Sequence, residues 1–191
     1  IVRGDNKVIL ITSAAQTVGK STLTANLGLI FAKSGRKTVI IDTDQYKPTQ
    51  HKLFSISNNI GISKVLQDRS LEKNIQTLKN SRLSIITNGP PAPDLNTLLG
   101  GPVMSGLLLK LREKYDVILI DTPPYPIASN AKSMLQMVDA VLLVARAGQS
   151  KEEIVRETTQ ELRDLKANVL GTVFTGTTIR RSYQRYLKER K

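Results

Sequence analysis

The sequence predicts an α/β fold in which helices flank both faces of a mostly parallel central sheet. Three observations support this fold class. Apolar runs of strand length alternate with stretches of helical period, which is typical of a parallel sheet with crossover helices. Two of the apolar runs end in aspartates, at the edge where such sheets form their ligand sites. A Gly-Lys-Ser sequence stands between the first apolar run and the first amphipathic stretch, the strand-to-helix context of a phosphate-binding turn.

In the first half of the chain, the pattern predicts a long helix that begins at Lys20 and ends before Gly35. The segment 88–102 is rich in proline and glycine, and we expect it to lack regular structure. The apolar face of the long helix carries Leu23, Leu27, Ile30 and Phe31. The other elements predicted here are strands at 8–11, 39–41 and 83–86 and a short helix at 62–66.

In the second half, a helix is predicted at 103–114, followed by strands at 117–120 and 141–144. A closing strand is predicted at 169–174. The helix before it presents Ile154, Thr158, Leu162 and Leu165 on one face. No internal repeat or linker divides the chain, so we expect one domain over residues 1–176 and a basic tail with tyrosines over residues 177–191.

The length and composition fit one domain of a soluble type. The chain has 191 residues, enough for one sizeable core and too few for two. It has no cysteine, which excludes disulfides and a cysteine nucleophile, and one histidine, which cannot build a histidine-rich metal site. No apolar run is long enough to span a membrane. Because the chain opens with Ile1 and has no signal-peptide pattern, we expect it to be a piece of a longer protein.

The charge balance is strongly basic. The net charge is +12, from 28 Lys and Arg against 16 Asp and Glu, which favours anionic partners such as nucleotides, nucleic acids or an acidic membrane surface. The basic excess is spread over the chain, densest at 180–191, and aromatic residues make up only 4%. Nucleic acid is therefore not an expected partner, because binding to single strands relies on aromatic stacking.

The sequence at positions 19–21 is the Gly-Lys-Ser ending of a P-loop. Lys20 is expected to reach the β and γ phosphates of ATP or ADP, and the Ser21 hydroxyl to take one position on Mg²⁺. Ala14 stands where the motif has its first glycine, so a helix start with an incidental lysine is the alternative. The residues expected to contact the nucleotide are Thr17, Val18, Gly19, Lys20, Ser21 and Thr22.

Aspartates at the ends of two predicted strands support the P-loop interpretation. Asp42 and Asp44 follow one strand, and Asp121 follows another. Because the carboxyl ends of parallel strands meet at one edge of the sheet, all of them can converge on the phosphates and the magnesium. The alternative is that each aspartate is a turn or cap residue. Their combination beside a P-loop favours a functional site.

Several segments resemble the bacterial tyrosine kinases, and together they span nearly the whole chain. Residues 42–51 are similar to the second aspartate motif of that family, and residues 115–124 to its Walker B stretch. Residues 59–66 and 89–99 also resemble it. The wider group of ATPases for chromosome partitioning and septum placement has a signature lysine at the position of Ala15. Its absence favours the kinase branch.

The resemblance implies an ATP-dependent tyrosine autokinase on the cytoplasmic side of a bacterial inner membrane. It also implies a membrane-spanning partner that governs surface-polysaccharide length and export, either upstream in the same chain or as a separate protein. Self-association into a ring is implied as well, with phosphorylation of tail tyrosines on a neighbouring subunit. The candidate acceptors are Tyr183 and Tyr186. Their helical spacing with Ile179 and Leu187 makes simple packing a strong alternative.

In such a kinase, Lys20 and magnesium neutralise charge on the phosphates. Ser21 and Asp121 hold the metal, Asp44 supports its shell, and Asp42 orients or deprotonates the acceptor tyrosine. These assignments follow from the P-loop context together with the resemblance.

The chain departs from the family pattern in the P-loop, where Gln16, Thr17 and Val18 replace Pro-Gly-Glu. If position 17 needs a positive φ, its threonine costs about 1–2 kcal/mol. Tyr46 replaces an arginine, and residues 173–176 lack an asparagine that helps to hold adenine. Three alternatives therefore remain: a nucleotide-binding module that has lost transfer, a partitioning-type ATPase, and a structural subunit in which ATP only holds a ring together.

Overall fold

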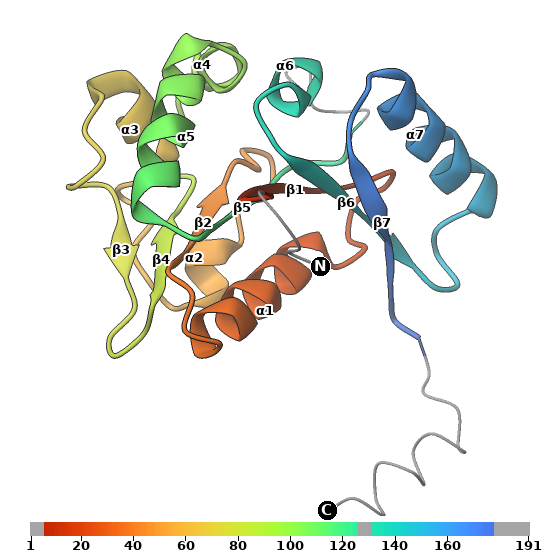
Figure 1. The fold of residues 1–191 in the computed structure, drawn as a ribbon, viewed down its shortest axis with the longest axis horizontal. Coiled ribbons are helices and arrows are strands. Elements are labelled where there is room, and N and C mark those ends of the chain that lie inside the picture. The colour runs from red at the N-terminus through yellow and green to blue at the C-terminus, as the bar shows by residue number, and fades with distance from the viewer. Residues whose placement is uncertain (1–5, 126–130, 178–191) are drawn as a thin grey trace, which may run out of the picture.

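The central feature of the fold is a seven-stranded sheet with the strand order β3-β4-β2-β5-β1-β6-β7 (Figure 1). The computed structural model describes residues 6–125 and 131–177. Neighbouring strands pair in parallel, except that β3 runs antiparallel to β4. The predicted mostly parallel sheet is therefore confirmed. The strands are β1 (Val8–Ser13), β2 (Thr38–Asp42), β3 (Gln76–Thr77), β4 (Leu83–Ile86), β5 (Val117–Asp121), β6 (Ala140–Arg146) and β7 (Val169–Thr175).

Helices cover both faces of the sheet, as predicted (Figure 1). One face carries α1 (Lys20–Lys33) and the short α2 (Gln50–Leu53). The opposite face carries α3 (Ile62–Asp68), α4 (Leu95–Leu99), α5 (Pro102–Lys114), α6 (Ala131–Leu135) and α7 (Glu152–Asp164). Among the described residues, no helix is long and apolar enough to cross a bilayer.

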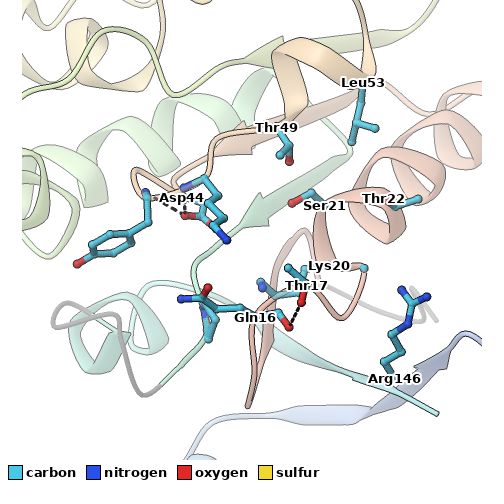
Figure 2. A pocket seen from close by; sticks show the side chains of 13 residues that line it. Gln16, Thr17, Lys20, Ser21, Thr22, Asp44, Thr49, Leu53 and Arg146 are labelled. Carbon is cyan, nitrogen blue, oxygen red and sulfur yellow. Dashed lines mark hydrogen bonds between the residues drawn. The ribbon is translucent and has the colours of Figure 1, made fainter. Parts of the chain in front are cut away.

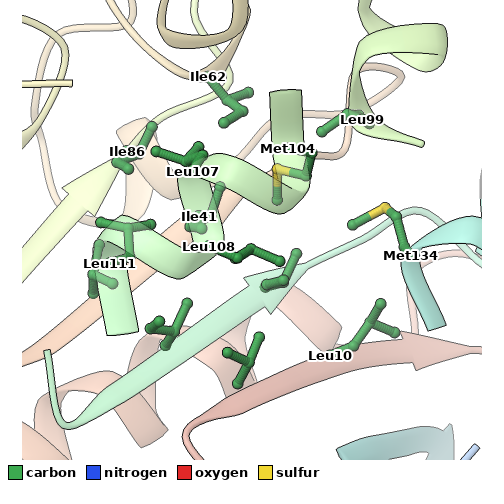
Figure 3. Packing of buried hydrophobic residues seen from close by; sticks show 14 of the residues in the cluster. Leu10, Ile41, Ile62, Ile86, Leu99, Met104, Leu107, Leu108, Leu111 and Met134 are labelled. Atoms are coloured by element: carbon green, nitrogen blue, oxygen red, sulfur yellow. The ribbon is translucent and has the colours of Figure 1, made fainter. Parts of the chain in front are cut away.

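Each central strand contributes apolar side chains to both faces, which explains the continuous apolar runs of the sequence. In β1, Val8 and Leu10 pack on the side of α5, whereas Ile9 and Ile11 pack on the side of α1. Figure 3 shows the larger cluster, in which Met104, Leu107, Leu108 and Leu111 of α5 lie over the sheet. Two apolar layers therefore hold the sheet between the helices.

The long helix begins at Lys20 as predicted, but its expected apolar face is partly wrong. Ile30 is 61% exposed, and the sheet side of α1 is built largely from small residues, including Ala25, Gly28 and Ala32. A Cβ on Gly28 would lie 2.6 Å from Cδ1 of Ile40. The helix therefore packs very close to β2, closer than larger side chains would permit.

The prediction that residues 88–102 lack regular structure is wrong, because α4 lies within this segment. Its Leu95 and Leu99, four residues apart, are both buried in the larger apolar cluster. Residues 178–191, including Tyr183 and Tyr186, lie outside the described residues. The division into a domain at 1–176 and a tail at 177–191 therefore stays a prediction.

Candidate functional site

The P-loop connects the end of β1 to the start of α1, and two of its residues have left-handed backbone conformations. Gly19 has a φ of 93° and Thr17 a φ of 58°. The strain anticipated for a threonine at position 17 is therefore present, at about 1–2 kcal/mol. The Thr17 hydroxyl donates to the Gln16 carbonyl at 2.8 Å and accepts from Nε2 of Gln149 at 3.3 Å. A side chain from the loop after β6 thus helps to hold the unusual residue.

The P-loop borders a cavity of about 330 Å³ at the carboxyl end of the sheet. Figure 2 shows Lys20, Ser21 and Thr22 at the start of α1, with Thr49 and Leu53 of the α2 segment facing them across the cavity. The residues that line it are Gln16, Thr17, Gly19, Lys20, Ser21, Thr22, Asp44, Tyr46, Lys47, Thr49, Leu53, Pro124 and Arg146. The first turn of α1 therefore opens into a space where its free N–H groups favour an anion.

Lys20 is a buried cation, only 6% exposed. Burial lowers the pKa of Lys20, whereas the nearby carboxylates of Asp121 and Asp44 oppose this effect. Burial of an ammonium group is unfavourable unless anions surround it. Phosphate oxygens bound in the cavity would place further negative charge beside the Lys20 ammonium group.

Asp121 ends β5 and is fully buried, with 0% exposure. Its Oδ2 accepts a hydrogen bond from Nε2 of Gln50 at 2.8 Å, while Oδ1 has no hydrogen-bond partner among the described residues. Burial raises the pKa of Asp121 to about 6, although Gln50, Ser21 and Lys20 favour the ionised form. A buried carboxylate oxygen without a partner calls for a bound water or cation.

Asp42 is also fully buried, but its carboxylate contacts the backbone. Its two oxygens accept hydrogen bonds from the N–H groups of Asp44, Thr49 and Gln50, each at 3.1 Å. Burial and the neighbouring charge of Asp121 raise the pKa of Asp42 well above its usual range. Asp42 therefore holds the start of α2. This contact is the kind of cap role that the sequence analysis gave as the alternative to a functional role.

Asp44 lies at the cavity itself. Its Oδ1 accepts hydrogen bonds from the N–H groups of Tyr46 at 3.1 Å and Lys47 at 3.0 Å (Figure 2). It therefore stabilises a turn and at the same time presents a carboxylate to the cavity. Tyr46, at the position where the family pattern has arginine, is 55% exposed beside it.

The donor set fits magnesium held jointly with a nucleotide. No group of three or more acidic or histidine side chains in the described part of the chain could hold a metal alone. Ser21 at the cavity and the free Oδ1 of Asp121 are oxygen donors of the kind that Mg²⁺ prefers. Phosphate oxygens and waters commonly fill its other positions, so a complete protein cage is not required.

Sequence reasoning missed several residues of this site, among them Gln50 and Arg146. Gln50 connects Asp121 to the first turn of α1, through Nε2 contacts to Asp121 and to the Ser21 carbonyl. Arg146 lines the cavity from the end of β6. Arg146 carries a usable signal, because β6 ends at the same edge of the sheet as β2 and β5. Gln50 carries none, since an amide side chain after a turn is chemically ordinary.

Comparisons with known proteins identify the family. The family model described as ParA, NUBPL iron-transfer P-loop NTPase, matches residues 5–179. The tyrosine-protein kinase YwqD of Bacillus subtilis is 33% identical over 171 residues, which cover 89% of this chain and 72% of that protein. The chain belongs to the bacterial tyrosine-protein kinases.

Solved kinase domains share the fold of this bacterial tyrosine kinase domain. The kinase domain of VpsO has a TM-score of 0.85 at 34% identity, with 91% of this chain and 86% of that chain covered. The kinase domain of Escherichia coli ETK has a TM-score of 0.84 at 30% identity, with 93% and 72% covered. The present chain spans 25% of the full-length etk protein of that species.

A septum site-determining protein, MinD of Pyrococcus horikoshii, has a TM-score of 0.75 at 23% identity, with 95% of this chain and 76% of that chain covered. This likeness concerns the fold alone. The identity to tyrosine kinases confirms the predicted kinase branch over the partitioning and septum-placement ATPases. Nucleotide binding follows from membership of the P-loop NTPases.

Proposed function

We propose that this domain binds Mg-ATP in the P-loop cavity and transfers the γ-phosphoryl group to tyrosine. The observation that carries the proposal is the combination of a buried Lys20 with a buried Asp121 whose Oδ1 is unpartnered. The first group suits phosphate oxygens, and the second suits a magnesium ion or its water. Ser21 and Asp121 would hold the metal, with Asp44 in its outer shell. When bound, the metal would neutralise negative charge on the phosphates.

In the transfer step, the tyrosine oxygen forms a bond to the γ phosphorus, and the bond from that phosphorus to the bridging oxygen of ADP breaks. The tyrosine proton passes to a carboxylate, which we assign to Asp42. Its raised pKa makes this carboxylate more basic than an ordinary aspartate. Because Asp42 is buried and contacts Thr49 and Gln50, the acceptor reaches it only if residues 43–49 move.

We further propose that the acceptors are Tyr183 and Tyr186 and that the phosphate comes from a neighbouring subunit in a ring. YwqD and ETK are both named tyrosine kinases, which supports the reaction class. Full-length etk is about four times as long as this chain, which covers 25% of it and leaves room for a fused membrane-spanning segment. We propose that such a partner, fused or separate, holds the kinase domain at the cytoplasmic side of the membrane. The chimeric protein CapA2B2 also shares the fold, with a TM-score of 0.84 at 31% identity.

A mixing experiment tests the proposal. A Lys20→Ala chain with an intact tail is combined with a Tyr183→Phe/Tyr186→Phe chain with an intact site, in the presence of Mg-ATP. Phosphotyrosine detected by mass spectrometry is expected only on the Lys20→Ala chain. Labelling of neither chain, when the parent binds ATP, would favour a nucleotide-binding module without transfer. Asp42→Asn and Asp44→Asn variants then report which carboxylate the transfer step requires.

A further inference from the structure

Gln50 is a fully buried glutamine at which separate parts of the site meet. Its Nε2 donates to Oδ2 of Asp121 at 2.8 Å and to the carbonyl of Ser21 at 3.0 Å. Its backbone N–H donates to Oδ2 of Asp42 at 3.1 Å. One residue therefore joins the end of β5, the first turn of α1 and the end of β2.

The contact to Asp121 determines which carboxylate oxygen is free. The terminal torsion of an aspartate has a broad preference, so an isolated carboxylate has no fixed orientation. Here Oδ2 is bound by Gln50, and Oδ1 is the oxygen without a partner among the described residues. The same amide also contacts the backbone of Ser21, the other expected metal ligand. Hydrogen bonds of this kind orient metal ligands and influence metal affinity.

Stability alone does not account for Gln50. Its Oε1 is buried and has no hydrogen-bond partner within the described part of the chain, and an unsatisfied buried acceptor is destabilising. The start of α2 is held by backbone contacts from Thr49 and Gln50 to Asp42. These contacts do not involve the amide side chain. The role of the side chain can therefore be separated from the folding of this segment.

We infer that Gln50 is a positioning residue that directs Oδ1 of Asp121 and the Ser21 turn toward magnesium. It thereby governs the metal-dependent part of nucleotide binding, while the P-loop retains its own hold on the phosphates. The inference rests on the proposed Mg-ATP site and adds a residue to it.

The test compares ADP affinity in EDTA with ADP affinity in excess Mg²⁺, measured by calorimetry. Gln50→Met removes the amide at similar length, and Gln50→Glu keeps the shape but replaces the donor with a carboxylate. Gln67→Met is the matched control, because Nε2 of Gln67 donates to Asp94 at an exposed position away from the site. We expect both Gln50 variants to lose about tenfold or more of the gain that Mg²⁺ brings. The affinity of Gln50→Met in EDTA should stay within about twofold of the parent, whereas the added carboxylate of Gln50→Glu should also weaken binding in EDTA by repelling the phosphates.

Each outcome decides between distinct explanations. A parallel fall for Gln50→Met in EDTA and in Mg²⁺ would show a structural role, and an unchanged Mg²⁺ gain in that variant would also overturn the inference. A parent without any Mg²⁺ gain would overturn the proposed site itself. If the variants do not fold, NMR of the parent serves instead. Addition of Mg²⁺ to the ADP-bound domain should shift the Gln50 side-chain amide signal, and an unmoved signal would refute the positioning role.

Discussion

Replacement of Asp121 by asparagine should stabilise the nucleotide-free domain while weakening its response to Mg-ADP. The wild-type carboxylate is fully buried, and its pKa is raised from 3.8 to about 6. This rise corresponds to roughly 3 kcal/mol of lost stability at neutral pH. Asparagine keeps an acceptor for Gln50 and removes the buried charge. Because Asp42 titrates in the same environment, we expect a net gain of about 1–3 kcal/mol in the free energy of unfolding.

The pH dependence of this gain has a defined sign. In the unfolded chain, Asp121 loses its proton near pH 4, whereas the folded protein keeps it until about pH 6. Between these values the folded state binds more protons, so the stability of the parent falls as the pH rises. The advantage of Asp121→Asn should therefore be full above pH 6 and fall to roughly a third near pH 4.5.

Urea unfolding at pH 7.5 and pH 4.5 measures this effect, and Asp139→Asn provides a control of opposite sign. Burial alone would raise the pKa of Asp139, but Arg112 and the N–H groups of Val8 and Lys7 outweigh it and lower the pKa. That carboxylate stabilises the fold above its usual pKa, so its removal should cost about 1–3 kcal/mol at pH 7.5. A nucleotide-free Asp121→Asn domain less stable than the parent at pH 7.5 would refute the reasoning.

Three further outcomes are expected. Lys20→Ala should lower ATP affinity by about 10–100-fold, whereas Lys33→Ala in the last turn of the same helix should not, as calorimetry would show. Gly61→Ala should destabilise the domain by more than about 2 kcal/mol in urea unfolding, because its Cβ would lie 2.3 Å from the Thr87 carbonyl oxygen. Gly106→Ala, with nothing within 4 Å, should instead be neutral or stabilising by about 0.5–1 kcal/mol. The +12 charge should favour anionic over neutral liposomes at low salt, with release as salt rises; equal recovery from both in a flotation assay would contradict this.

The buried strands and the P-loop were predictable because their signals are local. A continuous apolar run predicts a strand covered on both faces, and Gly-Lys-Ser after such a run predicts a phosphate-binding turn. The helix α4 was missed because Pro and Gly residues surround Leu95 and Leu99, so the helical spacing of these two leucines was discounted. Tertiary burial of that pair overrides the local breakers.

The contacts of Asp42 and Gln50 were not predictable because they depend on the return of the chain after β2. A sequence motif places an aspartate at a strand end, but it does not say which backbone N–H groups will meet its oxygens. Here residues 49 and 50 fold back onto Asp42, and the Gln50 amide then reaches Asp121. The functional interpretation of an aspartate and its cap interpretation are therefore compatible in this chain.

The arrangement of charges supports the proposed binding of a metal–nucleotide complex. Asp42 and Asp121 occupy paired positions on neighbouring strands, and each is buried with a raised pKa. Two like charges in one buried site destabilise the free protein, and Lys20 compensates only in part because burial also lowers its own pKa. In the proposed complex, a magnesium ion at Asp121 would add positive charge where carboxylates repel, and phosphates would add negative charge where Lys20 is buried. Binding of the proposed Mg-ATP complex would relieve the repulsion between carboxylates and the burial cost of Lys20 together, so the instability of the free site would contribute to its affinity for the complete complex.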